Sequence, residues 1–294
     1  MAILPLTASS HPAPGGSDVA RGRWAVVLGA SDGTGAAVAR AVARDPGLDV
    51  FGVHRGRHPE SADAVARDVV AAGRRAVMRV AEAGTAASAK LGADALLEVA
   101  GPRQVRLFVH SIANASVGAL VAGDKLLEPH QLEKTFNSMA HSFVYWAREL
   151  FARDLLAPSA RLVGLTNPVV GSLVPGLGAI AAGKAALEIY VRQLAAELGP
   201  LGHRVNLVNF GLVDTSAARV GFPPEHWDRV AARASLVTPA QRLCTVEEVG
   251  RLVSVLTGDA AEWFNGATLD FTGGMTQSLL GTVLCDDRRE RVNP

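Results

Sequence analysis

The sequence predicts an α/β protein with one doubly wound domain, in which helices flank both faces of a seven-stranded parallel sheet. Short apolar runs alternate with helical segments from residue 24 to residue 271, as in chains whose parallel strands are joined by helices. A glycine-rich turn directly follows the first of these runs. The 294 residues contain no internal repeat and no linker that would divide them, so one large domain accounts for the length.

Each strand is expected where a short apolar run lies between turn residues, and each helix where apolar residues recur every three or four positions. The expected strands cover residues 24–28, 48–53, 76–80, 105–110, 161–165, 204–209 and 267–271. The expected helices cover residues 36–44, 60–72, 87–100, 131–156, 179–198 and 246–256. Residues 212–238 show no clear periodicity, and we interpret them either as a lid over a ligand or as an ordinary surface excursion.

Turn residues set some of these boundaries. The segment Asp45-Pro46-Gly47 ends the first helix, because proline and glycine break the helical pattern. Gly73 closes the second helix, as glycine commonly does at a helix C-terminus.

The composition argues against several classes of function. The formal net charge is +1 and charged residues make up 19% of the chain, which disfavours a nucleic-acid or membrane-binding surface. No apolar stretch reaches the length of a membrane span. The two cysteines, Cys244 and Cys285, lie far apart without histidine in ligand spacing. No metal site is therefore expected, and the cysteine usage fits a reducing cytoplasm.

Both ends of the chain are expected to lie outside the domain. Residues 1–22 are rich in proline and glycine, without a cationic start or a long apolar run, so we interpret them as a flexible tail rather than a signal peptide. Residues 23–276 form the domain, and residues 277–294 a C-terminal tail.

The glycine-rich turn predicts a dinucleotide site. Gly29, Gly33 and Gly35 of the segment GASDGTG follow a strand and open a helix. In that context glycine permits a tight turn and lets the backbone approach a pyrophosphate at the helix N-terminus. A glycine triplet alone is a weak signal, but the strand before it and the helix after it support a Rossmann-type nucleotide-binding domain.

The spacing of these glycines resembles that of the short-chain dehydrogenase/reductase superfamily. Residues 204–206 (RVN), followed by Gly211 and Thr215, resemble the segment of that superfamily around its sixth strand. Residues 266–274 (GATLDFTGG) resemble its final strand and glycine pair. The likeness covers residues 24–275.

Within the superfamily, two segments are similar to the enoyl-acyl-carrier-protein reductase branch. They are residues 109–115 (VHSIANA) and residues 183–188 (GKAALE). The first glycine loop is of the ordinary superfamily type, so the motifs specify the superfamily more closely than the branch.

The resemblance implies a nicotinamide dinucleotide, and the second strand favours NADP(H). This strand ends in VHRGR, so Arg55 and Arg57 are available and no acidic residue occurs before Glu60. An arginine here suits a 2′-phosphate, whereas an acidic residue would bind the 2′-hydroxyl of NAD. The alternative is that either arginine only solvates a loop. The Asp that the family often places after its third strand, to bind the adenine amino group, corresponds to Arg79.

The lysine with which the superfamily holds the nicotinamide ribose is present as Lys184. Only four of the 29 lysine and arginine residues are lysines, so a lysine at this place indicates a need for a compact ammonium group. A solvated surface lysine is the alternative. The cofactor contacts that the resemblance implies are Gly29, Ser31, Asp32, Gly33, Thr34, Gly35, His54, Arg55, Val80, Ser111, Ile112, Ala113, Lys184, Gly211, Val213 and Thr215.

The tyrosine that normally works with this lysine is missing. The superfamily places it four residues before the lysine, and the enoyl reductase branch seven before, on one helical face. Here those positions hold Ile180 and Leu177. Seventeen residues before the lysine, where the superfamily has serine and the branch an aromatic residue, stands Asn167, with Thr166 beside it. Lys184, Asn167 and Thr166 are therefore the predicted catalytic residues.

The two tyrosines of the chain do not repair this loss. Tyr190 lies six residues after Lys184, about 120° around the helix and roughly 9 Å along it. Tyr145 shares a face of the expected helix 131–156 with His141. His141 or Tyr145 is a candidate proton donor, and core or interface packing is the alternative for both.

Two classes of function follow. The first is an NADPH-dependent reductase of an enoyl or related carbonyl substrate, a small molecule that is free or linked to CoA or a carrier protein. Conjugate reduction tolerates the lost acid better than ketone reduction, because hydrogen bonds stabilise the enolate it forms. The second is an isomerase, cyclase or lyase that acts on a hydrophobic biosynthetic intermediate, in a pocket made apolar by Leu177 and Ile180, with NADP(H) structural or absent. A purely regulatory binder is a weaker version of the second.

The resemblance also implies self-association into a homodimer or homotetramer. The helices expected to mediate it are those of residues 131–156 and 179–198. Apolar residues near the C-terminus are further candidates for docking on a neighbouring subunit: Leu279, Leu280, Val283 and Leu284.

Overall fold

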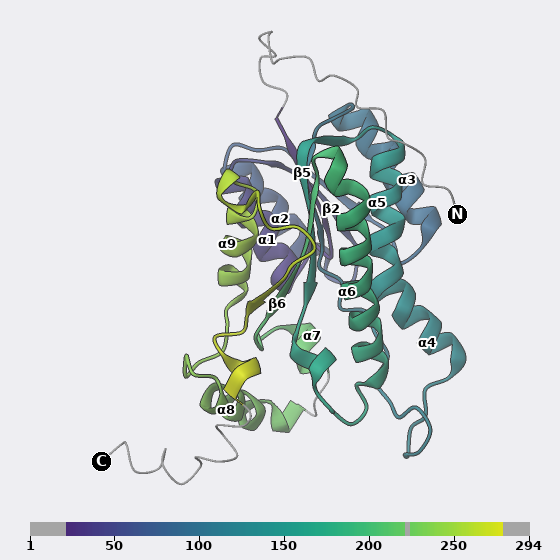
Figure 1. Ribbon diagram of the computed structural model, residues 1–294, viewed down its shortest axis with the longest axis vertical. Coiled ribbons are helices and arrows are strands. Elements are labelled where there is room, and N and C mark those ends of the chain that lie inside the picture. Colours follow the sequence, from purple (N-terminus) through teal and green to yellow (C-terminus); the bar gives the residue numbers. More distant parts are fainter. Residues whose placement is uncertain (1–21, 221–223, 279–294) are drawn as a thin grey trace.

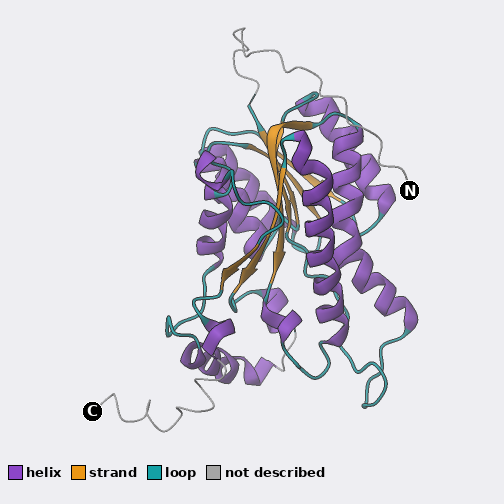
Figure 2. Ribbon diagram, viewed as in Figure 1, coloured by secondary structure: helices purple, strands orange, loops and turns teal. Residues whose placement is uncertain are grey.

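Seven parallel strands form one sheet in the order β3-β2-β1-β4-β5-β6-β7 (Figures 1 and 2). The structure is a computed structural model that describes residues 22–220 and 224–278. The strands are β1 (Trp24–Leu28), β2 (Asp49–His54), β3 (Ala76–Val80), β4 (Val105–His110), β5 (Leu156–Thr166), β6 (Arg204–Phe210) and β7 (Thr268–Phe271). The predicted doubly wound domain is confirmed, and all expected strands except the fifth agree to within one residue at each end.

Helices cover both faces of the sheet (Figure 1). On one face lie α1 (Gly33–Arg44), α2 (Pro59–Ala71) and α9 (Val246–Val255). On the other face lie α3 (Ala86–Ala100), α5 (Ser142–Ala152) and α6 (Gly178–Leu198). Three further helices lie toward the carboxyl ends of the strands: α4 (Pro129–Phe136), α7 (Ser216–Arg219) and α8 (Trp227–Val237).

The inner strands are largely buried on both faces, which explains why their sequences are apolar runs rather than alternating patterns, whereas the edge strands β3 and β7 are partly exposed. Within β5, Leu162 belongs to the core beneath α3, α5 and α6, whereas its neighbour Val163 belongs to the core beneath α1, α2 and α9. The first core contains the buried aromatic side chains, and the fully buried part of the second consists of alanine, valine and leucine. Small side chains therefore line the face on which the glycine-rich turn opens α1.

The expectation of a single helix over residues 131–156 is wrong in its middle and at its end. A π-helical turn, Asn137–His141, separates α4 from α5, and α5 ends at Ala152. Asp154 then adopts a φ of 51°, a left-handed conformation that a helix cannot continue through. Leu156 already belongs to β5. The apolar spacing runs on through this turn, so periodicity alone did not reveal the boundary.

Residues 212–220 and 224–238 lie near the carboxyl ends of the strands and contain α7 and α8 (Figure 1). Arg219 links the two helices. Its Nε and Nη2 donate to the two carboxylate oxygens of Asp214 at 2.7 and 2.8 Å, and its guanidinium lies 5.1 Å from the ring centroid of the buried Trp227. These contacts connect α7 both to the residues after β6 and to α8.

The predicted tails fall almost wholly outside the described residues, as do Leu279, Leu280, Val283 and Leu284. No helix in the described part of the chain is long and apolar enough to cross a bilayer. The helices expected to mediate self-association expose Phe151 and Ile189, and association through them stays a prediction.

Replacing Gly92 by alanine should destabilise the fold. A Cβ at Gly92 of α3 would stand 2.2 Å from the ring of the buried Trp146, whose Nε1 is fixed by donating to Ala83 O at 3.1 Å. Alanine favours a helix by about 1 kcal/mol over glycine, but overpacking of this kind costs about 1–3 kcal/mol. We expect a lower free energy of unfolding in urea. Leu91→Ala, on the exposed side of the same helix, is the control, and a Gly92→Ala protein as stable as wild type would contradict the packing argument.

Candidate active site

The predicted site residues gather at the carboxyl ends of β1, β4, β5 and β6. β1 and β4 are neighbours, yet the chain leaves them toward helices on opposite faces (Figure 1). Such a switch point opens the crevice in which doubly wound proteins bind their ligands. Gly29 lies at this point with a φ of 84°, and a Cβ there would stand 2.1 Å from the backbone oxygen of Ser111. Only glycine permits this approach.

The N-terminus of α1 is suited to an anion. A Cβ at Gly35 would stand 2.1 Å from the backbone of the preceding turn, so the loop is tight here as well. Asp32 caps the helix by accepting from Gly33 N at 2.7 Å, and its other oxygen accepts from Ser216 Oγ at 2.6 Å. The N–H groups of Thr34 and Gly35 find no acceptor within the helix, and these are the donors that a pyrophosphate uses in such a turn. The residues present therefore fit a dinucleotide.

Arg55 follows β2 and reaches across to the loop after β4. Its Nη1 donates to Asn114 Oδ1 at 2.7 Å, and Asn114 Nδ2 donates to Ser138 Oγ at 3.1 Å. Burial, and next the positive charge of Arg57, lower the pKa of Arg55. Arg57 itself is exposed. Of the two arginines predicted to meet a 2′-phosphate, Arg55 is thus the one that the protein fixes. Its partner Asn114 lies within the segment of residues 109–115 but was not among the predicted site residues.

Glu82, and not Arg79, is the charged residue that follows β3. Arg79 lies inside the strand, where it pairs with Val53, and its side chain is exposed. β3 ends at Val80, and Glu82 stands two residues later with its carboxylate accepting from Gly84 N at 3.3 Å. The correspondence of Arg79 to the adenine-binding position of the family stays a prediction. A carboxylate at Glu82 has the acceptor chemistry that an adenine amino group requires.

Lys184 lies in α6 with its ammonium group buried. Nζ donates to Leu165 O at 2.7 Å, and the residue is 5% exposed. Burial lowers the pKa of Lys184 to about 8. Thr166, the last residue of β5, is buried, and its Oγ1 has no partner in the described part of the chain. Asn167 instead caps a short 3-10 turn by accepting from Val169 N at 3.3 Å, so Thr166 is the predicted catalytic residue with an unengaged hydroxyl.

Two more buried polar atoms without a partner among the described residues lie at this end of the sheet. They are Nδ1 of His110, which ends β4, and Oδ1 of Asn209, whose Cα pairs with that of Thr166 across β5 and β6. His110, Thr166 and Asn209 alternate in phase with the core beneath α3, α5 and α6. Unpaired buried polar atoms are rare. Three of the six such atoms among the described residues, those of His110, Thr166 and Asn209, therefore lie at the carboxyl ends of β4, β5 and β6.

His110 is held neutral. Its Nε2 lies 2.7 Å from Ser142 Oγ, which donates to Ser138 O at 2.9 Å. Burial, and next the charge of Lys184, lower the pKa of His110 to about 3. The ring therefore adds a dipole to the site without competing with Lys184 as a cation.

The tyrosines and His141 form a cluster of their own. Tyr190 Oη lies 3.0 Å from His141 Nδ1, and Tyr145 Oη donates to Asn137 Oδ1 at 3.3 Å. The ring centroids of Tyr145 and Tyr190 lie 6.2 and 5.8 Å from that of His141. These contacts fit the packing interpretation, and proton donation by His141 or Tyr145 stays a prediction.

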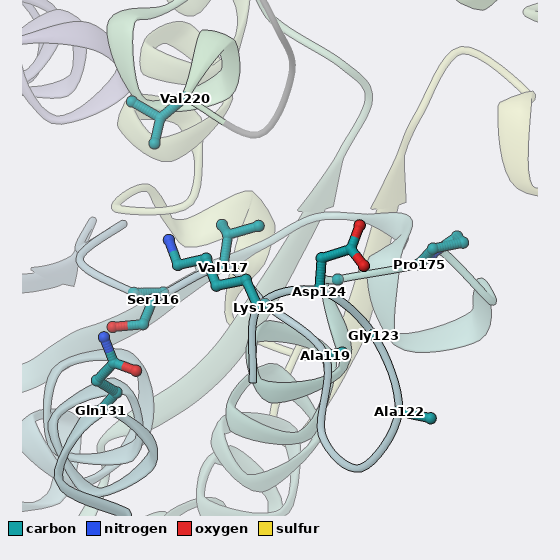
Figure 3. A pocket seen from close by; sticks show the side chains of 13 residues that line it. Ser116, Val117, Ala119, Ala122, Gly123, Asp124, Lys125, Gln131, Pro175 and Val220 are labelled. Carbon is teal, nitrogen blue, oxygen red and sulfur yellow. The ribbon is translucent and has the colours of Figure 1, made fainter. Parts of the chain in front are cut away.

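A cavity of 690 Å³ is lined by residues of the loop after β4, by Gln131 of α4, by Pro175 and Gly176 just before α6, and by Val220 after α7. Figure 3 shows Ser116, Lys125 and Gln131 on one side of it, with Val220 opposite. Pro175 and Val117 add apolar surface. Val220 forms part of the wall, and a lid stays one of the two interpretations of residues 212–238.

The other predicted cofactor contacts end β2 or β3, or follow β1, β4 or β6 closely. They are Ser31, His54, Val80, Ser111, Ile112, Ala113, Gly211, Val213 and Thr215. They differ in what they offer a ligand. His54 is buried, and its Nδ1 accepts from Gly56 N at 3.3 Å, so its ring packs in the protein. Val213 is buried as well, and Thr215 caps α7. Val80 is exposed at the end of β3.

Comparisons with known proteins agree with this architecture. The family described as Enoyl-(Acyl carrier protein) reductase matches residues 29–276. The 1-cyclohexenylcarbonyl-CoA reductase of Streptomyces collinus is 30% identical over 263 residues, 87% of this chain and 88% of the relative. An NADPH-dependent aldehyde reductase-like chloroplastic protein of Arabidopsis thaliana is 30% identical over 264 residues, 86% of this chain and 94% of the relative. A short chain dehydrogenase of Burkholderia cenocepacia, solved in complex with NADP, has a TM-score of 0.75 and 26% identity, over 86% of this chain and 97% of that one.

The fold and the site define a nucleotide-binding enzyme of the short-chain dehydrogenase type. The chain belongs to the Enoyl-(Acyl carrier protein) reductase family of the short-chain dehydrogenase/reductase superfamily. It is an oxidoreductase, and the resemblance drawn from residues 109–115 and 183–188 is confirmed.

Binding of NADPH should weaken at alkaline pH through Lys184. The ammonium form, which is the one able to donate to ribose hydroxyls, predominates below its pKa of about 8 and is lost above it. We expect the dissociation constant to be flat near pH 7 and to rise by up to about tenfold per pH unit above pH 8. Lys184→Met should bind more weakly at pH 7 and show no such rise. Fluorescence titration across pH measures both, and an equal rise in both proteins would contradict the assignment.

Proposed function

We propose that the protein reduces an α,β-unsaturated thioester by conjugate addition of hydride, with NADPH as the reductant. The observation that carries this proposal is the exchange of groups around Lys184. Leu177 and Ile180 stand where an acidic hydroxyl would lie, and the hydroxyl left beside the lysine is the buried Oγ1 of Thr166, unpaired within the described residues. That set of groups can stabilise an oxyanion but lacks a strong acid.

The chemistry distinguishes the two kinds of reduction. A reduced nicotinamide, when bound, supplies a hydride. Addition to a ketone carbon builds an alkoxide that needs a proton from an acid, whose help is worth about 10²- to 10⁴-fold. Addition to the β-carbon of an enoyl thioester moves the C=C electron pair toward the carbonyl, so that an enolate forms and its oxygen needs a hydrogen bond. Protonation of the α-carbon by water then completes the saturated thioester.

The site residues have distinct roles in this proposed step. Thr166 Oγ1 donates a hydrogen bond to the thioester oxygen as its negative charge grows. Lys184 holds the ribose and places a positive charge near the same oxygen, and the neutral His110 leaves that charge undiminished. The apolar Leu177 and Ile180 keep the surroundings poor in water, which strengthens both interactions.

The substrate class is supported by the cavity and by a relative. The cavity of 690 Å³ has apolar walls at Val117, Pro175 and Val220, with polar groups at Ser116 and Gln131. Such a lining suits an acyl group with a polar attachment. The Streptomyces collinus relative is named for an α,β-unsaturated acyl-CoA. A CoA thioester or a carrier-protein thioester is therefore the proposed form of the substrate.

Thr166→Val should reduce turnover without weakening cofactor binding. We expect kcat with cyclohexenylcarbonyl-CoA to fall by about 10²-fold, the effect of removing one donor to an oxyanion, while Thr166→Ser keeps most activity. Thr257→Val is the control. It replaces a buried threonine near the amino end of β4, where its backbone oxygen accepts from Arg106. NADPH deuterated at the transferred position should label the β-carbon of the product.

Two outcomes would contradict this function. Label at a carbinol carbon from an acetoacetyl thioester, with no turnover of the enoyl thioester, would indicate ketone reduction. No consumption of NADPH with either thioester would favour the non-redox alternative, which the apolar pair Leu177 and Ile180 keeps open.

Arg55→Ala should remove the preference for NADPH. Arg55 is the ordered cation after β2, and no acidic residue occurs in this turn. A charged contact to a phosphate contributes about 1.5–3 kcal/mol, so we expect the dissociation constant of NADPH to rise by about 10- to 100-fold. The constant of NADH should change less than twofold. Equal effects on both nucleotides would show that Arg55 does not contact a 2′-phosphate.

A further inference from the structure

We infer that Asn114 is a positioning residue for cofactor specificity, because it fixes the guanidinium of Arg55 in the orientation that selects a 2′-phosphate. The inference rests on the proposed use of NADPH and adds the residue on which the selection depends. Arginine has a long side chain with many rotamers, so an exposed arginine loses entropy when it orders on a ligand. A fixed acceptor removes part of that cost before the ligand arrives.

Asn114 is well placed to be such an acceptor. It is 7% exposed, and both ends of its amide are engaged: Oδ1 accepts from Arg55 Nη1 at 2.7 Å, and Nδ2 donates to Ser138 Oγ at 3.1 Å. The orientation of the amide is determined, because a flip would place its NH₂ group against the N–H of Arg55, and arginine has donors only.

Ser138 is itself buried and hydrogen-bonded. It is 2% exposed within the π-helical turn Asn137–His141. Its backbone oxygen accepts from Ser142 Oγ at 2.9 Å, and its Oγ would lie 2.9 Å from a Cβ added at Gly84. Two buried side chains, those of Asn114 and Ser138, thus connect the guanidinium of Arg55 to the π-helical turn between α4 and α5.

The neutrality of asparagine matters as much as its place. Arg57 adds positive potential near Arg55, and Glu82 opposes it. An acidic residue at position 114 would form an ion pair with Arg55 and cancel the charge that a phosphate must meet. A neutral amide uses one N–H of the guanidinium and leaves Nε and Nη2 to form paired bonds with phosphate oxygens.

A double-mutant cycle on the full chain tests the inference. Dissociation constants of NADPH and NADH are measured for wild type, Asn114→Ala, Arg55→Ala and the double variant. Asn114→Ala should raise the dissociation constant of NADPH by about 3- to 10-fold, which corresponds to part of the free energy of one charged hydrogen bond. It should raise the dissociation constant of NADH by less than twofold. In the Arg55→Ala background it should have no further effect, because Asn114 acts through Arg55. Asn114→Asp should raise the dissociation constant of NADPH more than Asn114→Ala does, and it should leave the dissociation constant of NADH unchanged.

Control variants distinguish positioning of Arg55 from local packing and from a general change in surface charge. Arg148→Ala removes an exposed charge from α5 and should change neither constant. Thermal unfolding checks each variant, and Asn114→Ser replaces Asn114→Ala if the latter does not fold. Equal losses for the two nucleotides, or a loss that persists in the Arg55→Ala background, would overturn the inference and indicate local packing. Loss of the preference on Arg55→Ala without any change on Asn114→Ala would overturn it while the proposed use of NADPH stands. No change on Arg55→Ala would overturn both.

Discussion

The site depends on one close approach of the backbone, where the turn after β1 passes against the turn after β4. Gly29 meets the backbone oxygen of Ser111 with no space for a side chain, and Gly35 packs on the same turn. As a result α1 begins directly at the crevice, and its free N–H groups face the position of an anion. The same approach sets the distance between the ends of β2 and β4, so Arg55 can reach Asn114 across β1. A side chain at Gly29 would separate all of these groups at once.

Burial of Lys184 is the second constraint, and it works together with the loss of the acid. An ammonium group that donates to one backbone oxygen in an apolar setting is held in its charged form only weakly, and its pKa falls to about 8. In the proposed reaction, an anionic nucleotide and a developing enolate would both stabilise the charged form. The apolar Leu177 and Ile180 would strengthen this mutual stabilisation, because charges interact more strongly where water is excluded. The replacement of a hydroxyl by apolar side chains therefore does more than delete a proton donor.

The fold was largely predictable because strands buried on both faces leave continuous apolar runs, and the glycine turn fixed their direction. The error in the helix of residues 131–156 has a local cause, since neither the π-helical turn nor the left-handed Asp154 interrupts the apolar spacing. Lys184 and Thr166 were singled out by the family resemblance and by spacing from the lysine; the structure buries both, and their catalytic roles stay predictions. Asn114 and Asn209 were not singled out, because what marks them is contact or register with residues far along the chain. No periodic pattern records such a relation.

The π-helical turn, which the sequence pattern hides, joins the two ends of the cofactor crevice. Ser138 Oγ accepts from Asn114, which holds Arg55 at the end proposed for the 2′-phosphate. Ser138 O accepts from Ser142, whose Oγ bonds His110 at the end near Lys184. The hydrogen bonds that lead to Arg55 and those that lead to His110 thus both start from Ser138. A π-helical turn costs regular helical bonding and is commonly kept where function requires it. Here the turn has a geometric consequence: Ser138 is hydrogen-bonded both toward Arg55, the cation proposed to bind the 2′-phosphate, and toward the buried ring of His110.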